Sequence, residues 1–108
     1  MAFKVIVMPA AEADIEEYAE FIALDSRDRA RKWLDEIWNR ILDLSDAPLT
    51  FPLIPESADL GVELRDFVHH SHRVVYLVKE DEGVVEVLRV YHGRRRSISK
   101  GHIAPSDS

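Results

Sequence analysis

Apolar residues in the first part of the chain recur at every third or fourth position, the period of a helix with one buried face. These positions are Ala11, Ile15, Tyr18 and Ile22. Acidic residues cover the rest of the circumference, and Pro9 suits the first turn of a helix. We therefore predict a helix that begins near Pro9, preceded by a short strand within residues 3–8, where β-forming residues dominate.

The same period continues after a short break, which predicts a second helix. Its apolar positions are Ala30, Trp33, Leu34, Ile37, Ile41 and Leu44. Ser26 is placed to cap this helix, and only Asp25 and Ser26 separate it clearly from the first one. An antiparallel helical hairpin is the expected arrangement.

The pattern is lost between residues 45 and 61, where Pro48, Pro52 and Pro55 fall close together. Because proline cannot donate to a helix or a ladder, we expect no regular structure here. Leu49 and Phe51 are unsuited to water, so the segment is expected to be an ordered loop that wraps over the core.

Alternating apolar positions in the second half predict three strands, over residues 63–68, 72–79 and 84–91. The acidic turn before the last strand ends in Gly83, which is free to adopt a positive φ. The predicted order is β-α-α-β-β-β. This is an α+β fold with a small, mostly antiparallel sheet and a two-helix hairpin on one face. Residues 1–97 form one domain, and residues 98–108 form a polar tail.

Composition narrows the class of protein. With 46% hydrophobic and 31% charged residues, and no apolar run long enough for a membrane, the chain resembles a soluble cytosolic protein. Residues 1–60 carry 13 acidic and 6 basic side chains (−7), and residues 61–108 carry 7 and 8 (+1). The net charge of −6 argues against broad binding to nucleic acid, and we expect no sequence-specific DNA binding by this chain alone.

No metal site or cofactor is predicted. The chain has no cysteine, and it lacks a glycine-rich phosphate loop and a nucleotide fingerprint. His69, His70 and His72 are clustered, but strand alternation is expected to distribute them over both faces of the sheet.

The candidate functional residues are basic and gather in the strands and beyond the last one, where a rigid sheet holds side chains in contact with solvent. They are Arg65, Arg73, His92, Arg94 and Arg95. Each arginine within a strand can equally well form an ion pair of the scaffold, for instance with a neighbouring Asp66 or Glu86. Adjacent guanidiniums after His92 repel one another unless an anionic partner is near, which favours a contact surface there.

The ordered combination of these features resembles the RelE/ParE superfamily of bacterial toxin–antitoxin systems. It comprises the β-α-α-β-β-β order, the connector with "PLIPE", the "HRVVYLV" strand, the acidic turn and the ending "VLRVYHGRR". The connector and the ending are more similar to the ParE branch, which includes plasmid stabilisation toxins. The resemblance implies a toxin that inhibits DNA gyrase by binding, without chemistry of its own. It also implies neutralisation by a cognate, ParD-like antitoxin, for which Trp38 is a weak candidate anchor.

Two alternatives remain open. A RelE-like enzyme would cleave messenger RNA on the ribosome, with Arg65 and Arg73 holding phosphate and His92 transferring a proton. Gly93 then stands where such members carry an aromatic residue, and Tyr91 precedes His92 on the opposite side of the strand. The other alternative is an inactive relative that only binds a partner.

Overall fold

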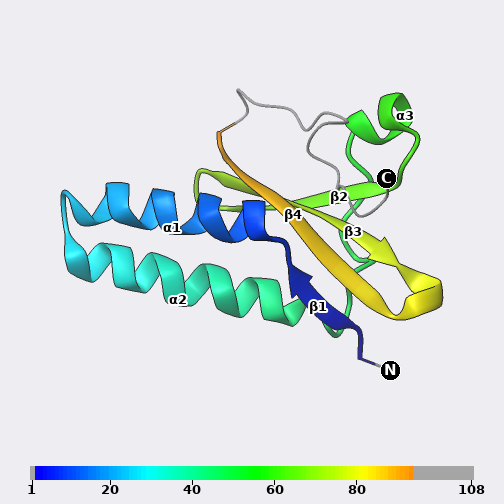
Figure 1. Ribbon diagram of the computed structural model, residues 1–108, viewed down its shortest axis with the longest axis horizontal. Coiled ribbons are helices and arrows are strands. Elements are labelled where there is room, and N and C mark those ends of the chain that lie inside the picture. Colours follow the sequence, from blue (N-terminus) through cyan, green and yellow to red (C-terminus); the bar gives the residue numbers. More distant parts are fainter. Residues whose placement is uncertain (1, 94–108) are drawn as a thin grey trace.

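The computed structural model describes residues 2–93, which fold as an α+β domain (Figure 1). The elements follow the predicted order, with one addition in the connector and a short 3₁₀ helix, Glu80–Glu82, before the last strand. The strands are β1 (Lys4–Val7), β2 (Leu64–His69), β3 (His72–Lys79) and β4 (Val84–His92). The helices are α1 (Pro9–Ala23), α2 (Arg27–Asp43) and α3 (Glu56–Leu60). Arg94, Arg95 and the tail lie outside the described residues.

The four strands form one sheet in the order β1-β4-β3-β2. β4 and β3 are antiparallel, as are β3 and β2, while the short β1 runs parallel to β4. The predicted mostly antiparallel sheet is confirmed. β1 pairs only with the first half of β4, from Val84 to Val87, so the second half of β4 has no strand on that side within residues 2–93.

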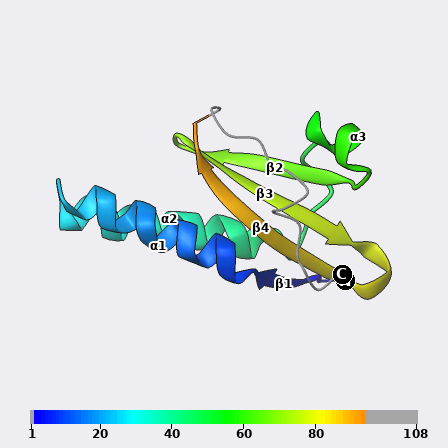
Figure 2. The same cartoon turned by 45° about the horizontal axis from the view of Figure 1, so that its top comes forward.

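The helical hairpin covers one face of the sheet, as predicted, and its tip projects beyond the strands (Figures 1 and 2). Ser26 caps α2 by accepting a hydrogen bond from the Arg29 backbone N–H. Apolar residues of both helices pack on alternate residues of the strands, with Ile15, Ile37 and Val74 fully buried. This core fixes the position of the helices over the sheet.

A smaller apolar cluster lies on the other face. It contains Leu64, Val75, Leu88 and Tyr91, with Leu60 of α3 packed against it. Between Val75 and Tyr76 the β3–β4 register shifts by one residue, because Val75 pairs with Arg89 and Tyr76 with Val87. That shift leaves Leu88 pointing into this second cluster.

The expectation of no regular structure between residues 45 and 61 was wrong in part. A short helix, α3, begins after Pro55 and ends at Leu60, and the following Gly61 caps it with φ 72°. Proline is excluded from helix interiors but not from the residue before a helix, where its missing N–H has no partner to lose. The connector is otherwise irregular apart from an isolated bridge between Leu53 and Arg65.

Candidate functional site

A row of three histidines crosses the end of the sheet. His69 at the end of β2 pairs with His72 at the start of β3, and His72 pairs with His92 at the end of β4. Residues opposite one another in a ladder share a face, so the prediction that alternation would distribute His69, His70 and His72 over both faces was wrong for His69 and His72. His69 and His72 flank a two-residue turn, and such a turn returns the chain on the same side.

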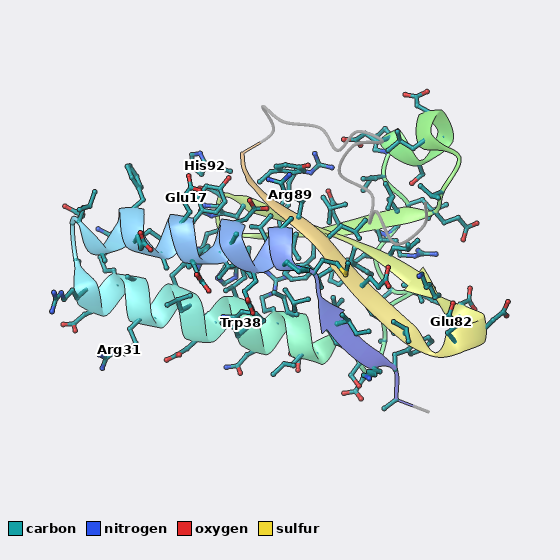
Figure 3. All side chains as sticks on the ribbon, viewed as in Figure 1. Glu17, Arg31, Trp38, Glu82, Arg89 and His92 are labelled. Atoms are coloured by element: carbon teal, nitrogen blue, oxygen red, sulfur yellow. The ribbon has the colours of Figure 1, made fainter. Side chains whose placement is uncertain are left out.

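Aromatic rings from both helices cover this row. The His72 ring lies 4.6 Å from the Tyr18 ring and 5.0 Å from the Trp33 ring, measured between centroids. The His92 ring lies 4.9 Å from that of His72. Beside them opens a pocket of about 820 Å³, whose walls are α1, the start of α2 and the β2–β3 turn. Charged residues on its walls include Glu17 and Lys32, and Figure 3 shows Glu17 on the same side of α1 as His92.

Burial keeps the inner histidines neutral. His72 is 8% exposed, and loss of hydration together with the nearby His92 lowers its pKa from 6.5 to about 4. Burial also lowers the pKa of His69. His72 Nδ1 and Trp33 Nε1 are buried without a hydrogen-bond partner among the described residues. At neutral pH His69 and His72 are therefore polar but uncharged.

Side chains of α1 cover the open edge of β4. Asp14 accepts a hydrogen bond from the Val90 backbone N–H at 2.9 Å, and the Tyr18 hydroxyl accepts one from His92 N–H at 3.1 Å. Asp14 also binds the Arg89 guanidinium through both carboxylate oxygens. The two helix residues, one turn apart, thus take the place of a neighbouring strand and fix the position of His92.

Arg65 and Arg73 both serve the scaffold. Arg65 donates to the backbone oxygens of Phe51, at 2.5 Å, and of Leu49, at 3.4 Å, and so fastens the connector to β2. Arg73 forms ion pairs with Asp66, at 2.8 Å, and Glu56, at 3.4 Å, and its side chain is 12% exposed.

The three residues of the ribonuclease alternative are not brought together. Arg73 pairs with Tyr91 while His92 pairs with His72, so Arg73 and His92 point to opposite faces of the sheet. Arg65 lies opposite Tyr76, four residues along β3 from His72, a separation of about 13 Å at the rise of a strand.

Sequence reasoning missed the inner part of the site. His72, Tyr18 and Trp33 were assigned to strand or core, although His69 and His72 at a spacing of three around a turn were a usable signal. Trp38, the candidate antitoxin anchor, is partly buried against the main core. Within residues 2–93, no helix combines the length and the apolar character that crossing a membrane would require.

The fold is similar to that of chains in three solved structures of toxin–antitoxin proteins. The toxin–antitoxin complex RelBE2 from Mycobacterium tuberculosis contains a chain of similar fold, with TM-score 0.61, 22% identity, and coverage of 85% of this chain and 92% of that one. A chain of the chromosomal ParDE system from P. aeruginosa gives a TM-score of 0.66 at 15% identity, and the match covers 86% of this chain and 98% of that one. A mutant of the E. coli toxin RelE in the free state gives a TM-score of 0.58 at 17% identity, and the match covers 85% of this chain and 84% of that one.

The particular family follows from the sequence itself. Residues 5–97 match the family described as ParE toxin of type II toxin–antitoxin system, parDE. The chain belongs to this family, as its strand and connector motifs predicted. No curated protein is similar to it in sequence.

Proposed function

We propose that this toxin inhibits DNA gyrase by binding, and that it has no catalytic step of its own. The observation that supports this proposal is the internal use of Arg65 and Arg73, which hold the connector and α3 in place. Neither guanidinium is therefore available beside His92 to hold the phosphate of an RNA substrate. Membership of the ParE toxin family points the same way.

The proposed target surface lies where β4 ends. His92 is exposed there, and the chain continues into Arg94 and Arg95, which lie outside the described residues. Arginine is the side chain best suited to an anionic partner surface. Arg65 and Arg73 are no longer proposed as target contacts, because their guanidiniums are engaged within the domain.

The proposed partner is a ParD-like antitoxin that covers apolar groups which the free toxin exposes. Leu42 on α2 is 58% exposed and lies one turn from Trp38, so both belong to one stripe of the helix. An amphipathic segment laid across this stripe would bury both residues. We place the toxin and its partner in the cytoplasm.

A second candidate function, ribosome-dependent cleavage of messenger RNA, has one observation in its favour. His72 and His92 lie close together, and the pocket beside them also includes Arg29 and Lys32. Two imidazoles with nearby cations are a set that acid–base cleavage of RNA could use. Burial of His72, which keeps it neutral, leaves His92 as the proton-transferring residue of this alternative.

The two functions differ in whether DNA synthesis or protein synthesis stops first in a cell. The test is to induce the chain without antitoxin and to follow incorporation of labelled thymidine and labelled leucine during the first minutes. Inhibition of gyrase stops thymidine incorporation first and leaves broken chromosomal DNA. Arrest of leucine incorporation first, with shortened messengers, would support the ribonuclease, and unchanged growth would identify an inactive relative.

A further inference from the structure

Three side chains with metal-binding atoms converge beside the pocket, at the junction of α2 and the β2–β3 turn. They are Glu36 of α2, His69 at the end of β2 and His70 in the turn. One ligand atom from each lies within 4.8 Å of the other two, and Glu36 Oε1 lies 3.4 Å from His70 Nε2. We propose that these three residues bind a divalent transition-metal ion, with Zn²⁺ as the best match.

The geometry suits zinc. Bonds of about 2.0–2.2 Å to imidazole nitrogen and carboxylate oxygen, arranged as a tetrahedron, hold neighbouring ligand atoms about 3.4 Å apart. The Glu36–His70 distance already has this value, and a shift of about 1.4 Å brings the 4.8 Å separation to it. Two imidazoles and one carboxylate form a set that zinc binds with a fourth position open.

His69 provides the second observation. His69 is only 4% exposed, and its Nε2 is buried with no hydrogen-bond partner in the described part of the chain. A buried ring nitrogen that lacks a hydrogen-bond partner is available to bind a metal ion.

Arg40 is the nearby charge that opposes a cation. Its guanidinium is engaged in the scaffold, because it donates to the Val68 backbone oxygen at 2.6 Å and lies over the Phe67 ring.

The competing explanation is a simple contact between Glu36 and His70. Both side chains are well exposed, at 42% and 64%, and such a pair contributes little to stability. This contact explains why Glu36 and His70 lie close together. It leaves the buried Nε2 of His69 without a hydrogen-bond partner, which costs free energy. A bound ion accounts for all three positions, and it would fasten the β2–β3 turn to α2 beside the pocket.

The experiment is calorimetric titration of the full chain, stripped with chelator, with ZnCl₂ at pH 7.5, repeated with Co²⁺ to record its absorption spectrum. We expect one equivalent to bind with a Kd of about 10 μM or tighter, and a Co²⁺ spectrum typical of nitrogen and oxygen ligands. Glu36→Gln and His70→Asn should each weaken binding at least tenfold. Asparagine tolerates the left-handed conformation that His70 adopts, with φ 55°, so this variant keeps the turn.

The matched control is His92→Ala, which removes an exposed histidine near the pocket but outside the proposed site. Its affinity for Zn²⁺ should equal that of the unchanged chain. Absence of binding below about 1 mM would overturn the proposal. So would binding that survives both Glu36→Gln and His70→Asn, or binding that is lost in His92→Ala, because the ion would then be held elsewhere. Circular dichroism of each variant confirms that loss of binding is not loss of fold.

Discussion

Asp14 and Arg89, 75 positions apart in the chain, form a two-point ion pair, with Nε–Oδ2 and Nη2–Oδ1 distances of 2.7 and 2.9 Å. The Asp14 and Arg89 side chains are 14% and 18% exposed. Oδ2 of Asp14 also accepts the hydrogen bond from Val90 N–H, so one carboxylate joins α1 to both the side chain and the backbone of β4. This contact fixes α1 against β4, the strand that carries both Arg89 and His92 (Figure 3).

We predict that Asp14→Ala lowers the free energy of unfolding by about 2–4 kcal/mol, because it leaves a mostly buried guanidinium and a backbone N–H without their acceptor. Urea denaturation measures the change. The control is Asp25→Ala, which removes an ion pair between side chains that are 81% and 72% exposed and should cost less than about 0.5 kcal/mol. Equal losses in the two variants would contradict this role of Asp14.

The low pKa of His72 predicts a loss of stability in acid. Its pKa is about 4 in the folded protein and 6.5 when hydrated, so the unfolded chain binds more protons between these values. The free energy of unfolding should therefore fall as pH decreases through this window, by about 3 kcal/mol at most. His72→Phe, measured with chelator present, should show a clearly smaller slope over the same range. An unchanged slope would show that other groups dominate.

The hydroxyl of Tyr18 is predicted to have a modest but local effect. Tyr18→Phe removes the acceptor of the His92 N–H hydrogen bond and should cost about 1 kcal/mol. Hydrogen exchange of the His92 amide should quicken at least fivefold, while the amide of Val90, held by Asp14, should change little. Equal acceleration at both amides would mean that the end of β4 opens as a unit.

Arg73 is predicted to act on stability and not on target binding. Arg73→Ala leaves Asp66 and Glu56 close together without their cation and should cost about 2–4 kcal/mol. At a temperature where the variant remains folded, its inhibition of the target per molecule should match that of the unchanged chain. A large loss of inhibition in fully folded protein would return Arg73 to the functional surface.

Periodicity was enough to predict the helical hairpin, since the apolar residues around Ile15 in α1 and around Ile37 in α2 each recur at helical spacing. The Ser26 cap is also a local signal. The acidic turn was equally local, and Gly83 has the expected positive φ of 65°. The ion pairs could not be chosen from sequence, because Arg89 finds Asp14 only when α1 has docked on the edge of β4. The histidine row depends on the length of a two-residue turn, which decides whether His69 and His72 share a face. Helix α3 was missed because proline was treated as a barrier when it stood just before the helix.

The central claim, inhibition of gyrase by binding, is tested most directly in a two-part titration of one protein preparation. Relaxed plasmid, ATP and purified gyrase report supercoiling and DNA breakage, and a translating ribosome extract reports the integrity of messenger RNA. We predict that supercoiling falls in proportion to the toxin bound, that broken DNA accumulates until antitoxin is added, and that messengers remain intact. Cleaved messengers together with unaffected gyrase at large molar excess would contradict the proposal.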